Sequence, residues 1–214
     1  MDVRVAEWAG EYAPGVLAAS VYALPPADRL AGAVAAHRAG CLIHIDLIVT
    51  ARAGGFVHAG VTPDEVRAIS ARVPSAGLDV HVMVAGAPAA ARVAALGAVT
   101  AVLADANLAR VSAAPDLLDA LAPALDPGVP LWEVLWPATQ PVGVAAGALL
   151  MLIPPGTKQQ ADPARLGVLP GLTAHTPAGV DGGVSRPLAD VALGAGATYA
   201  VLGRAIFHTQ SDNG

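Results

Sequence analysis

Short apolar runs alternate with alanine-rich stretches along most of this chain. Uninterrupted apolar runs of this length are typical of strands buried on both faces of a parallel sheet. We expect strands at residues 16–21, 41–47, 78–83, 99–104, 130–135, 148–153, 178–181 and 199–202. Helical patterns lie between several of them, at residues 27–39, 63–72, 88–96, 115–125 and 187–193.

Strands that alternate with helices predict βαβ units around a parallel sheet. Eight such strands in 214 residues favour a (β/α)₈ TIM barrel. We expect one domain over residues 1–214, with residues 1–15 as an amino-terminal extension. A doubly wound open sheet is the alternative, but no Gly-x-Gly-x-x-Gly segment follows the first strand to mark a dinucleotide site.

Composition and net charge limit the classes of partner that this chain is expected to have. The net charge of −5, without a basic cluster, argues against nucleic acid. No apolar stretch approaches the roughly 20 residues that cross a bilayer, and the charged start lacks the apolar segment of a signal peptide. We therefore expect a cytoplasmic protein, in which the lone Cys41 is a buried, inert thiol.

Polar side chains of one chemical kind end three of the expected strands. His44 and Asp46 share one face of a strand, because side chains alternate along it. His81 and Asp181 end two others. Active sites of (β/α)₈ barrels lie at the carboxyl ends of the strands. Two imidazoles and two carboxylates that converge there would hold one divalent metal ion and leave carboxylates for proton transfer.

Several segments, in order, resemble the ribulose-phosphate 3-epimerase family. They are Ala19-Ser20-Val21, His44-Ile45-Asp46, Leu78-Asp79-Val80-His81-Val82-Met83, Pro137-Ala138-Thr139, Met151, Val180-Asp181-Gly182-Gly183-Val184 and Gly203-Arg204-Ala205-Ile206-Phe207. The resemblance runs from about Ala19 to Phe207, with gaps. It implies a metal-dependent epimerase of a ketose phosphate, which removes and returns a proton through an enediolate.

The resemblance also assigns roles. It implies that His44, Asp46, His81 and Asp181 bind one divalent ion (Zn²⁺, Fe²⁺, Mn²⁺ or Co²⁺), and that Asp46 and Asp181 also move protons. Expected substrate-binding residues are Ser20, Met83, Met151, Gly182, Gly183, Gly203 and Arg204. Each has a plainer alternative: glycines that only turn the chain, methionines that fill the core, a serine bonded to backbone and a solvent-facing arginine.

The chain departs from the family pattern in its loops. The family's Met-Asp-Gly-x-Phe after the second-strand aspartate is missing, and residues 155–160 read Pro-Gly-Thr-Lys-Gln-Gln where the family has a glycine-rich phosphate loop. Lys158 would compensate for the lost glycines, or the substrate carries no phosphate. Helices 5 and 8 are expected to be short or missing, with residues 1–15 (including Trp8 and Tyr12) covering the exposed wall or a subunit interface. We expect a homo-oligomer for this reason.

Three functions compete. A sugar or sugar-phosphate epimerase leads, including one with a modified or unphosphorylated substrate. An aldolase or decarboxylase is disfavoured, because the chain lacks the Asp-x-Lys-x-x-Asp segment and Lys158 is its only lysine. A non-catalytic sugar- or metabolite-binding barrel remains open, since this fold hosts many activities.

Overall fold

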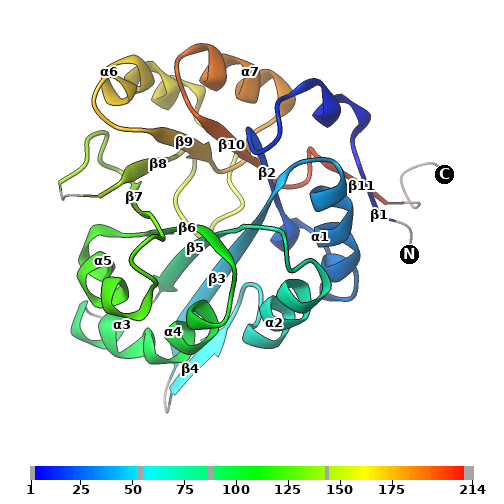
Figure 1. Ribbon diagram of the computed structural model, residues 1–214. Coiled ribbons are helices and arrows are strands. Elements are labelled where there is room, and N and C mark those ends of the chain that lie inside the picture. Colours follow the sequence, from blue (N-terminus) through cyan, green and yellow to red (C-terminus); the bar gives the residue numbers. More distant parts are fainter. Residues whose placement is uncertain (1–2, 53–54, 86–88, 143–144, 210–214) are drawn as a thin grey trace.

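Eight parallel strands close into a barrel in the computed structural model, which describes residues 3–52, 55–85, 89–142 and 145–209 (Figure 1). The barrel strands are β2 (Leu17–Ser20), β3 (Leu42–Arg52), β5 (Leu78–Ala85), β6 (Leu108–Ala113), β7 (Leu131–Leu135), β8 (Gly147–Met151), β9 (Ala178–Asp181) and β10 (Tyr199–Leu202). They pair in the order β2-β10-β9-β8-β7-β6-β5-β3, and a pairing between β2 and β3 closes the ring. The predicted (β/α)₈ architecture is confirmed.

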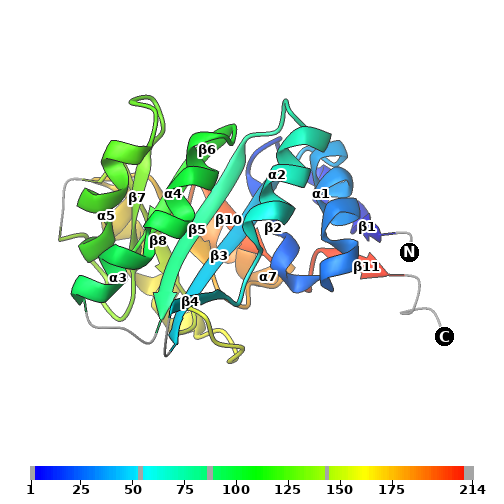
Figure 2. The same ribbon diagram turned by 90° about the horizontal axis from the view of Figure 1, so that it is seen from below.

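Helices surround the barrel on its outside (Figure 2). They are α1 (Arg29–Arg38), α2 (Pro63–Arg72), α3 (Ala89–Ala95), α4 (Gly97–Ala104), α5 (Pro115–Leu121), α6 (Leu169–Thr173) and α7 (Arg186–Gly194), with 3₁₀ turns η1 (Glu7–Glu11), η2 (Val21–Ala23), η3 (Pro26–Asp28), η4 (Ala122–Ala124) and η5 (Pro163–Val168). Helix α2 begins with a capping box in which Thr62 and Glu65 satisfy each other's backbone N–H groups. No helix among the described residues is long and apolar enough to cross a bilayer.

One predicted strand is wrong and one real strand was missed. Residues 99–104 lie in α4, where Val99, Val102 and Leu103 are buried against neighbouring helices. The fourth barrel strand is β6 instead. Its inward positions carry Arg110 and Ser112, so it lacks the apolar run that marks the other strands.

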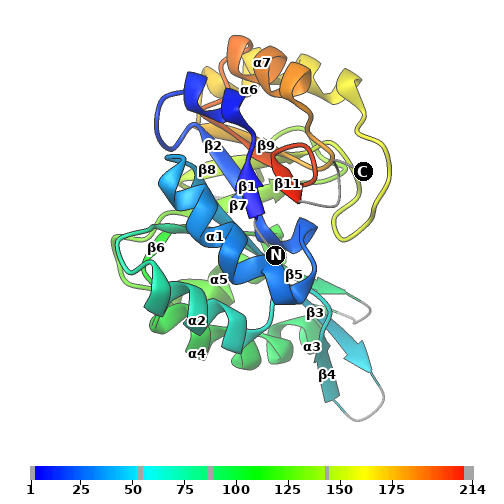
Figure 3. The ribbon, with the colours of Figure 1, turned by 90° about the vertical axis from the view of Figure 1, so that its right-hand side faces the viewer.

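In the described residues, the layer of helices around the barrel is incomplete at two places, as the sequence predicted. No helix lies between β7 and β8 in the described residues 136–142 and 145–146, and only a turn and the short strand β11 (Phe207–Thr209) follow β10 in the part described. Strand β1 (Val3–Val5) pairs antiparallel with β11 beside α1 (Figure 3). Trp8 and Tyr12 follow and pack on α7 through Arg186 and Asp190. The amino-terminal segment therefore covers the wall near the last strand.

The side chain of Arg165 binds the segment that follows β7, where the fifth helix of the barrel would begin. Arg165 in η5 donates hydrogen bonds to the carbonyls of Met151, Leu135, Pro137 and Ala138, at 2.6–3.1 Å. Its guanidinium also lies 4.5 Å from the ring centre of Trp136. These bonds hold residues 135–138 against the end of β8.

Strand β3 continues past the barrel. Its last residues pair antiparallel with β4 (Gly55–His58), and this hairpin extends beyond the other strands (Figure 3). The family pattern places a Met-Asp-Gly-x-Phe segment in this region. Here Ile48, from the same strand, lines the mouth of the barrel instead.

Candidate active site and metal centre

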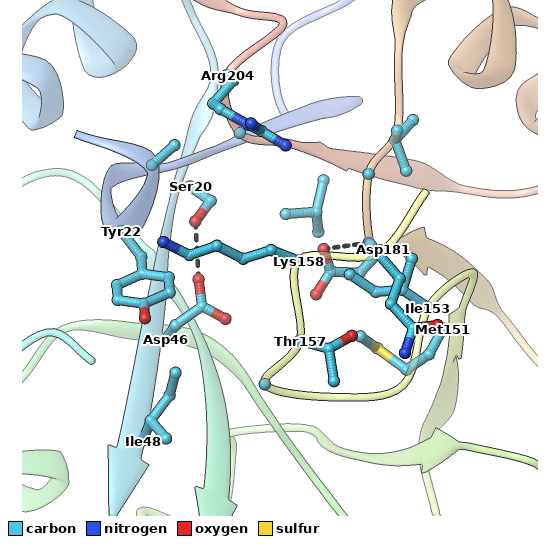
Figure 4. A pocket seen from close by; sticks show the side chains of 18 of the residues that line it. Ser20, Tyr22, Asp46, Ile48, Met151, Ile153, Thr157, Lys158, Asp181 and Arg204 are labelled. Carbon is cyan, nitrogen blue, oxygen red and sulfur yellow. Dashed lines mark hydrogen bonds between the residues drawn. The ribbon is translucent and has the colours of Figure 1, made fainter. Parts of the chain in front are cut away.

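A cavity of about 700 Å³ opens at the carboxyl ends of the strands. It is the position at which (β/α)₈ enzymes hold their substrates. All seven residues predicted to bind substrate line this cavity: Ser20, Met83, Met151, Gly182, Gly183, Gly203 and Arg204. Asp46 and Asp181 also line it, and they lie on opposite sides of it in Figure 4. Both predicted carboxylates and all of the predicted substrate-binding residues therefore line the same cavity.

The four predicted metal ligands lie together at the base of this cavity. One ligand atom from each of His44, Asp46, His81 and Asp181 lies within 4.8 Å of the others. His44 Nε2 is 3.5 Å from an Asp46 oxygen and 3.8 Å from an Asp181 oxygen. His81 Nδ1 is 3.9 Å and 3.6 Å from the same two oxygens. Ligand atoms about 2.0–2.2 Å from a tetrahedral ion stand roughly 3.4 Å apart, so the spacing suits a metal ion.

The nitrogens at the centre of this group have no other role. His44 and His81 are fully buried, and His44 Nε2 and His81 Nδ1 have no hydrogen-bond partner in the described structure. Buried polar atoms are rarely left without one. His44 donates from Nδ1 to Asp79 at 2.7 Å in the tautomer that leaves Nε2 free to accept. The donor set therefore fits a divalent cation.

Each carboxylate presents one oxygen to the histidines and has the other held by a neighbour. The Ser20 hydroxyl donates to Asp46 Oδ2 at 2.7 Å. The Gly182 N–H donates to Asp181 Oδ1 at 2.6 Å. These bonds fix both carboxylates without occupying the oxygens that face His44 and His81.

Charge interactions within the group favour an ionised Asp46 and a protonated His44. Burial raises the pKa of Asp46, but the nearby His44 and His81 outweigh burial and lower it to about 2. Burial lowers the pKa of His44, while the Asp46 and Asp79 carboxylates raise it well above its usual value. The site thus attracts positive charge into its centre, as a proton on His44 or as a cation among the ligands.

One end of the cavity offers backbone N–H groups and cationic side chains. Gly182 and Gly183 have φ angles of 100° and 69°, and they lead into the start of α7. At Gly182 a Cβ would come within 2.7 Å of Ile153, so a side chain has no room there. Arg204 and Lys158 are exposed, and both line the cavity (Figure 4). This end suits an anionic group.

Two residues inside the barrel, next to the site, were missed in the sequence. Asp79 accepts a hydrogen bond from His44, and Arg110 Nε lies 3.0 Å from Asp79 Oδ1 in an ion pair. Asp79 lies two residues before His81, so strand alternation places both on the inner face. That spacing was the available signal for Asp79. Arg110 gave none, because its strand was not recognised.

Comparisons with known proteins establish the fold. No family model matches the chain, and neither does any curated protein. Among solved structures, the phosphoribosyl anthranilate isomerase of Thermus thermophilus superposes with a TM-score of 0.58 at 16% identity, over 88% of this chain and 87% of that one. The N-(5'-phosphoribosyl)anthranilate isomerase of Pyrococcus furiosus gives a TM-score of 0.46 at 10% identity, over 89% and 88%. At this identity the first similarity shows a shared (β/α)₈ barrel.

Proposed function

We propose that this protein is a metal-dependent isomerase that epimerises a ketose phosphate at the carbon beside its ketone. The observation that carries the proposal is the group of two imidazoles and two carboxylates at the base of the cavity, with both inward nitrogens unpartnered in the described structure. The sequence resemblance to ribulose-phosphate 3-epimerases points to the same activity. The solved isomerase with the same barrel, whose title names a phosphoribosyl compound, is consistent with a phosphosugar ligand.

Epimerisation needs two proton-transfer groups on different faces of one carbon. A base removes the C–H proton beside the ketone, which leaves an enediolate, and an acid returns a proton to the opposite face. Asp46 on β3 and Asp181 on β9 face the cavity from opposite sides (Figure 4). We assign the two proton transfers to these carboxylates, with the choice of base set by the configuration of the substrate.

His44, Asp46, His81 and Asp181 would hold the divalent ion. When bound, such an ion supplies Lewis acidity that stabilises negative charge on substrate oxygens. Ser20 and the Gly182 N–H keep the two carboxylates in place. Met83 and Met151 provide apolar surface beside them. Zn²⁺, Fe²⁺, Mn²⁺ and Co²⁺ all suit nitrogen and carboxylate ligands.

The anionic part of the substrate would lie at the other end of the cavity. Gly183 and Gly203 would offer backbone N–H groups, Gly182 would leave room for close approach, and Arg204 would add a bidentate cation. Lys158 stands on the loop where the family has glycines. It would replace backbone contacts with a charge.

The changed loops support a second candidate on the same scaffold. Strand β3 extends into a hairpin where the family has its acidic loop, and Ile48 contributes apolar surface to the cavity. These features favour a modified or unphosphorylated sugar, either as a substrate or as the ligand of a non-catalytic barrel. A panel of ketoses with and without phosphate separates these cases: turnover supports an enzyme, and binding without turnover supports the non-catalytic alternative.

Substitution of the two carboxylates tests the mechanism. In Asp46→Asn and Asp181→Asn, epimerisation should fall by about 10²–10⁴-fold, the usual contribution of an acid–base group. Asp119→Asn removes an exposed carboxylate of α5, remote from the cavity, and serves as the matched control. Full activity in Asp181→Asn would mean that the proposed mechanism is wrong.

We also propose that the protein acts in the cytoplasm as a homo-oligomer. Several large apolar side chains are exposed, among them Val142 and Val191 at 78% and 56%. Light scattering at micromolar concentration measures the assembly directly. A monomer there would contradict the homo-oligomer.

A further inference from the structure

An ion pair of a buried aspartate and a largely covered arginine lies inside the barrel beside the proposed metal site. Asp79 is completely buried, and its two oxygens have different partners. Oδ2 lies 2.7 Å from His44 Nδ1, and Oδ1 lies 3.0 Å from Arg110 Nε. The strand register places His44, Asp79 and Arg110 opposite one another on β3, β5 and β6. The three side chains form a row across three adjacent strands.

Aromatic rings confine the arginine at the end of this row. The Arg110 guanidinium carbon lies 3.7 Å from the ring centre of Tyr199 and 4.8 Å from that of Trp132. Both rings are buried and pack edge to face on each other. A guanidinium keeps its positive charge in proteins. The Asp79 oxygen that faces Arg110 therefore lies against a fixed cation.

We propose that Asp79 and Arg110 are positioning residues that orient His44 as a metal ligand, an inference that rests on the metal site proposed above. With the Arg110 cation paired to Oδ1, Asp79 presents Oδ2 to His44 as an acceptor. The His44 proton then lies on Nδ1, and the Nε2 lone pair faces the centre of the site. A carboxylate behind a ligating histidine fixes the ring and its tautomer in the same way in other metal sites.

Charge inside the barrel supports the same assignment. Among the described residues that face the interior, Asp46, Asp79 and Asp181 each contribute one negative charge, and Arg110 contributes one positive charge. These four side chains carry a net charge of −2, which a divalent cation would neutralise when both histidines are neutral. Arg110 offsets the one carboxylate that is not itself a ligand.

Metal affinity measures the proposed role apart from catalysis. Purified metal-free protein is titrated with Zn²⁺ or Co²⁺ against a chromophoric chelator. Asp79→Asn keeps the shape of the side chain but places an amide between Arg110 and His44, and Arg110→Met removes the cation. Each should weaken metal binding by about 10–100-fold. Leu121→Ala removes a buried side chain of α5 as a control for general destabilisation, and should leave the affinity within about twofold.

A second measurement needs no variant. Long-range ¹H–¹⁵N NMR of the metal-loaded wild-type protein reports which ring nitrogen of His44 carries the proton. We expect Nδ1–H; a proton on Nε2 would overturn the proposal even if Asp79→Asn and Arg110→Met fail to fold. Wild-type affinity in Asp79→Asn would also overturn it while the metal site stands. Failure of the wild-type protein to bind metal at all would instead refute the site on which the proposal rests.

Discussion

Replacement of Gly179 by alanine tests the packing that holds the interior of the barrel together. Gly179 on β9 lies opposite Tyr199 on β10, and both face inward. A Cβ at Gly179 would lie 2.0 Å from Tyr199 Cε1, 2.4 Å from Cδ1 and 2.6 Å from Cζ. No carbon pair tolerates this distance, so the ring or the strand must move.

The ring has little freedom to move. Tyr199 is 1% exposed and is held between Trp132, at 5.4 Å between ring centres, and the Arg110 guanidinium. Overpacking of a well-packed core costs about 1–3 kcal/mol. For a chain of this length 1 kcal/mol corresponds to roughly 2–4 °C, so Gly179→Ala should lower the melting temperature by about 2–12 °C.

Thermal unfolding followed by circular dichroism gives the melting temperature. Gly171→Ala is the matched control, because a Cβ there meets no atom within 4 Å. In a Tyr199→Leu background, Gly179→Ala should cost less, since leucine lacks Cε1 and Cζ, two of the three ring atoms that clash. A melting temperature in Gly179→Ala equal to that of the wild type would refute the packing argument.

Three further predictions concern the rest of the fold. Burial raises the pKa of the Cys41 thiol to about 11, so alkylation by iodoacetamide at pH 8 should be far slower than for a free cysteine, and rapid labelling of the native protein would contradict this. Thr62→Ala removes the cap of α2 and should cost about 1 kcal/mol in urea unfolding, whereas Thr62→Ser should restore most of it; equal stability of all three proteins would exclude a role for the cap. Arg165→Ala should cost about 1–3 kcal/mol, since four carbonyls lose a partly exposed donor, and Arg165→Lys should recover little; complete rescue by lysine would show that charge alone suffices.

Most strands with uniform apolar sequence were predicted within two residues, whereas β3 continues five residues past its predicted end at residue 47. Both strand ends of β9 and β10 coincide with the prediction, because their apolar runs are bounded by turns. The lack of a fifth helix in the described residues between β7 and β8 was predicted from the small number of residues between these strands. These features depend on local sequence, which is why the sequence alone was sufficient.

The missed elements depend on contacts between distant residues. Helix α4 packs Val99, Val102 and Leu103 against other helices, and a short apolar run does not distinguish a strand from a buried helix segment. Strand β6 was missed because Arg110 and Ser112 point into the barrel. The pairing of β1 with β11 joins the two ends of the described chain, so no local pattern marks it.

The four candidate metal ligands were easier to predict from the sequence than the residues that contact them from behind. His44, Asp46, His81 and Asp181 end recognisable strands, and barrel geometry brings such ends together. Asp79 and Arg110 lie beside His44 inside the barrel only because of the register between β3, β5 and β6, which the sequence does not show. Residues that break the apolar pattern inside a barrel are therefore the ones to inspect for function.

Proton exchange at the reacting carbon tests the central claim most directly. Metal-loaded protein is incubated in D₂O with ribulose 5-phosphate, and the C3 proton is followed by NMR. The proposed function predicts loss of that signal together with the appearance of xylulose 5-phosphate. A C3 signal that persists, in protein with metal confirmed at His44, Asp46, His81 and Asp181, would contradict the proposed epimerisation of this ketose phosphate.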